Sequence, residues 1–189
     1  MKIRGLILAF GAVALLAIFG YLLLTPVGLR HSPDISLATI SGQRLQLSSY
    51  RGRPLLVTFW ATSCPGCLKE MPHLIELYHE LHPRGLEIIA IAMAHDPPDR
   101  VLAMSKARRI PYPVALDIDS TAAQAFGDVR MTPTSFLIAP DGRVVFQTTG
   151  QMNLARLRRD IIGLLTPAQT AIPAGSTRIP EASIDHDLG

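Results

Sequence analysis

The two cysteines of this 189-residue chain stand three positions apart, in Cys64-Pro65-Gly66-Cys67. They follow an apolar, β-branched run at 55–60 and precede a segment with helical spacing, which predicts a strand-to-helix turn where both sulfurs can meet. Paired thiols of this kind exchange with other disulfides through a mixed-disulfide intermediate. The sequence therefore predicts thiol-disulfide exchange at this turn.

The two sulfurs are expected to have different roles. Cys64 precedes the predicted helix and faces its free N–H groups, which stabilise a thiolate and lower its pKa from about 8.5. Cys67 lies one turn further and is held close enough to resolve the mixed disulfide. Pro65 suits the first helical position, where no N–H is needed.

Two simpler readings of the cysteine pair are less consistent with the sequence. A disulfide that closes so short a loop removes little entropy from the unfolded chain, so it is a poor staple for the fold. A structural zinc ion needs four ligands, whereas this chain has one cysteine pair and six scattered histidines. We therefore expect a redox-active disulfide with no metal and no cofactor.

The remaining pattern alternates strands and helices around this turn. Helical spacing is found at 65–82, more weakly at 100–109, at 121–126, and after the capping residue Asn153. Strand-like runs occur at 35–40, 45–47, 55–60, 86–94, 114–118, 134–139 and 144–148. Asp141-Gly142 between the last two runs predicts a β-hairpin. The class is α/β with a single domain at 34–165.

Residues 5–24 contain no charge and reach about 30 Å as a helix, enough to span a bilayer. Lys2 and Arg4 precede this run, which predicts residues 1–4 in the cytoplasm and the domain outside. A cleaved signal peptide is the alternative, but no small-x-small site follows residue 24. We expect a single-pass signal anchor in a bacterial inner membrane, a linker at 25–33, a periplasmic or other extracytoplasmic domain, and a tail without fixed structure at 166–189.

The charge distribution agrees with a membrane role for the N-terminus. The formal net charge is +3, and it comes from Lys2, Arg4 and Arg30, because 15 basic and 15 acidic residues follow. A neutral domain gives no support to nucleic-acid binding.

The motifs resemble those of the thioredoxin superfamily, specifically the membrane-anchored TlpA/ResA-type thiol-disulfide oxidoreductases. The resemblance covers residues 33–165. It is carried by Gly52-Arg53-Pro54, Phe59-Trp60-Ala61-Thr62 before the cysteines, Lys69-Glu70-Met71-Pro72 after them, and Met131-Thr132-Pro133-Thr134 before a strand. It implies a thioredoxin fold, with a central mixed sheet flanked by helices, an N-terminal hairpin extension and a central helix insertion.

The resemblance also implies roles for individual residues. Thr132-Pro133 corresponds to a cis-proline site whose backbone pairs with a substrate strand beside Cys64, and Trp60 is assigned to substrate binding with these two. Glu70 corresponds to an acidic residue near the cysteines that could move the proton of the resolving thiol. Thioredoxin has a buried Asp where this chain has Thr58, so Glu70 is expected to take over that task. Ser63 departs from the family's usual Trp, which is expected to expose Cys64 more and to alter which proteins dock.

Several functions stay open at this level. The resemblance favours a reductase of protein disulfides, as in cytochrome c maturation, fed by a membrane electron-donor protein. A disulfide oxidase or isomerase would share the same fold. A peroxiredoxin would need Thr or Ser where Ala61 stands. A copper-binding metallochaperone would prefer CxxxC spacing, and His95 is its one candidate ligand.

Overall fold

The computed structural model describes residues 13, 15–16, 20 and 31–165. The predicted cytoplasmic N-terminus, most of the membrane segment, most of the linker and the tail at 166–189 lie outside the described residues. No helix in the described part of the chain has the length and hydropathy that a membrane span needs. The signal anchor at 5–24 stays a prediction.

Seven strands form one mixed sheet in the order β2-β1-β5-β4-β3-β6-β7. Their bounds are β1 (Ser36–Thr39), β2 (Arg44–Gln46), β3 (Leu55–Trp60), β4 (Glu87–Ala92), β5 (Val114–Leu116), β6 (Thr134–Ile138) and β7 (Val144–Thr149). The central strands β3, β4 and β5 are parallel, while β6 and β7 form the antiparallel hairpin that Asp141-Gly142 predicted. The hairpin of β1 and β2 extends the other edge.

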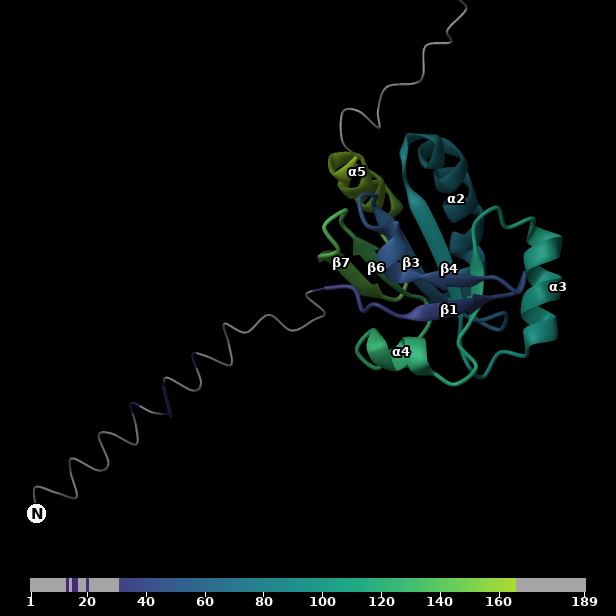
Figure 1. Ribbon diagram of the computed structural model, residues 1–189, viewed down its shortest axis with the longest axis horizontal. Helices are drawn as coiled ribbons and strands as arrows, with labels where there is room; N and C mark the ends of the chain where they lie inside the picture. Colours follow the sequence, from purple (N-terminus) through teal and green to yellow (C-terminus); the bar gives the residue numbers. More distant parts are fainter. Residues whose placement is uncertain (1–12, 14, 17–19, 21–30, 166–189) are drawn as a thin grey trace, which may run out of the picture.

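The helices cover the two faces of this sheet (Figure 1). They are α2 (Pro65–Leu81), α3 (Pro98–Arg108), α4 (Thr121–Ala125) and α5 (Leu154–Leu164), with short 3₁₀ turns η1 (Leu47–Tyr50) and η2 (His82–Arg84). The sequence predicted each of these helices within residues 31–165, but neither 3₁₀ turn. Helix α2 continues through Pro72, and α5 is capped by the Asn153 side chain, which accepts the Arg156 N–H.

All six residues of β3 are buried, as a strand covered on both faces requires. Leu56 and Trp60 pack on the side of α2 and α5. Leu55, Val57 and Phe59 pack on the opposite side with α4. Because apolar side chains on both faces fix the position of β3, the chain that leaves its carboxyl end enters α2 at a defined place.

Candidate active site

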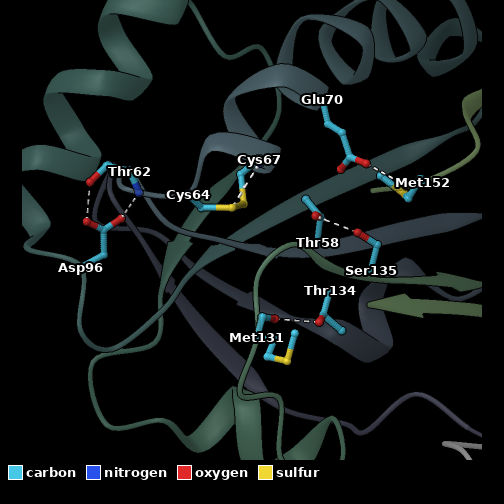
Figure 2. The surroundings of a disulfide bond; sticks show 10 residues. All are labelled: Thr58, Thr62, Cys64, Cys67, Glu70, Asp96, Met131, Thr134, Ser135 and Met152. Atoms are coloured by element: carbon cyan, nitrogen blue, oxygen red, sulfur yellow. Dashed lines mark hydrogen bonds between the residues drawn. A yellow bond between two sulfur atoms is a disulfide. The ribbon is translucent and has the colours of Figure 1, made fainter. Parts of the chain in front are cut away.

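The cysteine pair lies where β3 gives way to α2, and the two sulfurs are joined in a disulfide (Figure 2). Their Cα atoms are 5.3 Å apart. Cys64 is the N-cap residue of α2, with Pro65 as the first helical residue. The predicted strand-to-helix turn is therefore present in the structure.

The Sγ atom of Cys64 accepts a hydrogen bond of 3.1 Å from the backbone N–H of Cys67. A sulfur in this position takes the place of the usual oxygen of an N-cap side chain. In the dithiol form the same N–H and the positive end of the helix dipole would stabilise a thiolate on Cys64 rather than on Cys67. Cys64 is only 9 % exposed, so this residue stays largely covered although the small Ser63 precedes it.

A cis peptide bond joins Thr132 to Pro133, as the resemblance implies. The ring of Pro133 lies against the cysteine turn, because a Cβ placed on Gly66 would stand 3.3 Å from its Cδ. The Thr134 hydroxyl donates to the Met131 carbonyl at 2.7 Å, which holds the loop from the other side. Figure 2 shows this loop below the disulfide.

The backbone of Thr132 is available for a partner on this loop. Thr132 is half-buried and the preceding Met131 is 65 % exposed. Among the residues the structure describes, neither the N–H nor the carbonyl of Thr132 makes a backbone hydrogen bond. An extended polypeptide could pair there in the manner of an added strand.

Glu70 projects from α2 on the opposite side of the cysteines from Thr62 (Figure 2). Glu70 is 4 % exposed, and its carboxylate accepts the backbone N–H of Met152. Burial raises the pKa of Glu70, while the Met152 N–H and the charge of His73 act in the opposite direction. A carboxyl group with a raised pKa is better suited to exchange a proton near neutral pH.

A small cavity of about 20 Å³ lies behind Cys67, and Glu70 shares its lining with Cys67, Trp60, Tyr112 and Pro133. That volume admits about one water molecule. Trp60 is 3 % exposed, and its indole Nε1 has no hydrogen-bond partner among residues 31–165. Because its ring is buried in this lining, Trp60 offers little surface to a docked protein, which argues against the direct substrate contact assigned to it.

Thr58 occupies the position of the buried Asp in thioredoxin. Its hydroxyl accepts a hydrogen bond of 2.9 Å from the Ser135 hydroxyl across the β3–β6 pair. Thr58 lines the same cavity as Glu70. Glu70 is therefore the one carboxyl group in the described lining of this cavity.

Sequence reasoning missed the role of Asp96. Asp96 is 6 % exposed, and its carboxylate accepts both the backbone N–H and the hydroxyl of Thr62, each at 2.5 Å. This fixes the chain two residues before Cys64. The sequence feature that could have revealed this role is an acidic residue shortly after β4. The carboxyl ends of the neighbouring parallel strands β3 and β4 lie at the same edge of the sheet, so a residue after β4 lies near the chain that leaves β3.

The neighbouring His95 is exposed. No cluster of three or more His, Cys, Asp or Glu side chains that could hold a metal ion occurs in the described part of the chain. The structure therefore adds no support to the copper-binding hypothesis.

A helix-capping disulfide beside a cis-proline loop, on a thioredoxin-like sheet, defines a thiol-disulfide oxidoreductase. Residues 29–147 match the AhpC/TSA family, and the chain belongs to this family. Thiol-disulfide oxidoreductase ResA of Bacillus subtilis is 33 % identical over 140 residues, which are 74 % of this chain and 76 % of ResA. ResA of Geobacillus thermodenitrificans is 31 % identical over 130 residues, 69 % of this chain and 74 % of that protein. The ResA-type resemblance is confirmed.

Solved structures agree with this assignment. A putative thioredoxin from Neisseria meningitidis superposes with a TM-score of 0.67 at 29 % identity, over 72 % of this chain and 90 % of that one. A thiol:disulfide interchange protein of the thioredoxin family from Chlorobium tepidum gives a TM-score of 0.66 at 26 % identity, over 75 % of this chain and all of that one. The predicted thioredoxin-like fold is therefore confirmed.

Proposed function

We propose that this oxidoreductase works as a reductase of protein disulfides in an extracytoplasmic compartment. The observation that carries the exchange chemistry is the hydrogen bond from the Cys67 N–H to the Cys64 sulfur, and the ResA-type resemblance favours the reducing direction. This hydrogen bond makes Cys64 the sulfur whose thiolate is stabilised once the pair is reduced, and so the sulfur that attacks.

In the proposed cycle the Cys64 thiolate attacks one sulfur of a substrate disulfide. The substrate S–S bond breaks, a mixed disulfide forms, and the departing substrate sulfur leaves as a thiolate that takes up a proton. Cys67 then loses its proton and attacks the Cys64 sulfur, which releases the second substrate thiolate. Two electrons pass to the substrate, and the protein ends with the Cys64–Cys67 disulfide seen in the structure.

Glu70 is the group that we expect to take the proton from Cys67. Both side chains line the same small cavity, and the pKa of Glu70 is raised by burial. A carboxylate poised in this way can accept a proton from the resolving thiol, directly or through one water molecule.

The substrate is proposed to lie across the cis-proline loop. An extended segment that hydrogen-bonds to the Thr132 backbone would bring its disulfide to Cys64, because the Pro133 ring lies against Gly66 in the cysteine turn. The ResA-type resemblance favours apocytochrome c as this substrate, reduced before haem attachment.

The proposed electron donor is a membrane protein, and residues 5–24 are the proposed anchor. His31 forms an isolated β-bridge with Arg143, the residue directly before β7. This point lies at the end of the sheet where β3 begins, whereas Cys64 follows the end where β3 finishes. An anchor that precedes His31 would therefore hold the domain with the cysteines away from the point of attachment.

The equilibrium reduction potential of the full-length chain in defined thiol buffers tests the direction of electron flow. A value near that of thioredoxin, about −270 mV, supports the reductase. A value near −120 mV would reject it and make the protein an oxidase of folding substrates, since the dithiol form would then be strongly stabilised.

A further inference from the structure

We propose that the groove between the cysteine turn and α3 binds an acidic segment of the polypeptide that carries the substrate disulfide. The groove has a volume of about 500 Å³, and Thr62 and Ser63 form one of its walls. Figure 2 shows Thr62 on the side of the disulfide opposite Glu70 and Met152. None of the residues that line the groove also lines the cavity beside Cys67, to which Glu70 and Pro133 belong.

The opposite wall is one face of α3. Its groove-lining residues recur at the spacing i, i+3, i+4, i+7, i+8, which places them on a single side of the helix. They are Arg100, Ala103, Met104, Ala107 and Arg108. This wall is therefore apolar between its ends, with a guanidinium group at each end.

The charge of this face is positive. Arg100 and Arg108 are exposed, and neither forms an ion pair with any residue that the structure describes. None of the groove-lining residues is acidic, and the acidic residues of the segment 96–108 are Asp99, in the first turn of α3, and Asp96, whose buried carboxylate already accepts two hydrogen bonds from Thr62. Two unpaired arginines at the ends of this apolar wall fit a ligand with carboxylates and small side chains.

The dimensions of the groove indicate the size of its occupant. Arg100 and Arg108 are eight residues apart, which is about 12 Å along the helix. An extended chain covers that length with about four residues. Ser63, in the wall of the groove, directly precedes Cys64. A substrate whose disulfide meets the Cys64 sulfur could therefore place the residues next to that disulfide in the groove.

The wall formed by Thr62 and Ser63 has a fixed backbone and a small side chain next to Cys64. Asp96 fixes the backbone of Thr62, and the small, exposed Ser63 leaves the groove open at the position where the family usually carries Trp. Because Ser63 replaces the large Trp that is usual in the family, it changes the shape of the proposed docking surface. The inference deepens the proposed function and rests on it, because it assigns the substrate an acidic stretch of about four residues beside its disulfide.

Three synthetic peptides of one sequence test this, each with the same internal disulfide flanked on both sides by Glu, Gln or Lys. The full-length protein is reduced, freed of reductant, and mixed with each peptide, and the rate of peptide reduction is measured. We expect the Glu peptide to react at least about threefold faster than the Gln peptide at low salt. This ratio should approach one at high salt, because exposed charges are screened.

Two double variants assign the preference to the groove. Arg100→Gln with Arg108→Gln should bring the Glu-to-Gln rate ratio to about one, and Arg100→Glu with Arg108→Glu should make the Lys peptide the fastest. Arg44→Gln with Arg159→Gln removes the same charge from exposed arginines outside the groove and should keep the wild-type ratio. A gain for the Lys peptide cannot arise from misfolding.

The outcomes separate the two proposals. Equal rates for all three peptides in the wild type, or a ratio that survives both groove variants, overturn the docking proposal and leave the reductase intact. If the reduced wild type reduces none of the peptides, the proposed reductase activity fails and the docking proposal fails with it.

Discussion

Pro133 lies directly against Gly66, although 66 residues separate them in the chain. A Cβ on Gly66 would stand 3.3 Å from the Cδ of Pro133 and 3.6 Å from the Cγ of Gln151. The contact joins the cysteine turn to the cis-proline loop without an intervening side chain. The redox sulfurs and the backbone that could pair with a substrate are therefore held as one surface.

Gly66→Ala should destabilise the protein by about 1 kcal/mol, because the added methyl group meets a proline that is buried and cannot rotate away. Gly163→Ala is the matched control, since it lies in α5 with nothing within 4 Å of the new Cβ. It should stabilise the protein by about 0.5–1 kcal/mol through helix propensity. Urea denaturation of both variants measures the difference, and a stabilised Gly66→Ala would contradict the close contact.

Substitution of Cys64 and substitution of Cys67 should block disulfide reduction at different steps. Cys64→Ser should abolish disulfide reduction, because the attacking sulfur is lost. Cys67→Ser should accumulate a mixed disulfide, because its resolving sulfur is missing. Non-reducing gels followed by mass spectrometry identify the linked residue. Trapping of substrate on Cys67 in a Cys64→Ser protein would reverse the assigned roles.

Glu70→Gln should slow the resolution of a preformed mixed disulfide by at least about tenfold, because the proposed proton acceptor of Cys67 is removed. The wild-type rate should rise with pH as Glu70 ionises, and the variant should lack that inflection. Glu76→Gln, an exposed residue on the same helix, is the control. Identical pH profiles for wild type and Glu70→Gln would exclude the proton-transfer role.

The same carboxyl group predicts a pH dependence of stability. Burial raises the pKa of Glu70 above its ordinary value of 4.5, so the folded protein holds this proton more tightly than the unfolded chain does. The Glu70 contribution to the free energy of unfolding must therefore fall as pH rises from 4.5 through the folded-state pKa. Urea denaturation across this range should show wild type losing stability relative to Glu70→Gln, whose amide oxygen can still accept the Met152 N–H. A constant difference between the two proteins would show that the pKa is not raised.

Asp96→Ala should cost about 1–3 kcal/mol of stability, because the Thr62 N–H and hydroxyl both lose a buried acceptor. Asp96→Asn keeps one acceptor oxygen and should cost less. Thermal unfolding of the three proteins checks the order. Equal losses in the Asn and Ala variants would contradict the prediction that one retained acceptor oxygen preserves part of the stability.

The local pattern of residues was enough to predict the elements around the site. The apolar run at 55–60, the helical spacing after Pro65 and the Asp141-Gly142 turn each specify their structure through neighbours in the chain. The 3₁₀ turns at Leu47–Tyr50 and His82–Arg84 were not predicted, because segments of three or four residues carry no resolvable periodicity.

The sequence by itself determined the chemistry of this protein, because a CxxC pair before a helix combines two sulfurs and a helix N-terminus within four residues. Only the tertiary structure decided what surrounds that pair. The Asp96–Thr62 bonds, the Gly66–Pro133 contact and the burial of Glu70 beneath Met152 join residues between 34 and 82 positions apart. Such contacts depend on how strands β3, β4 and β6 align in the sheet, which no local pattern of residues encodes.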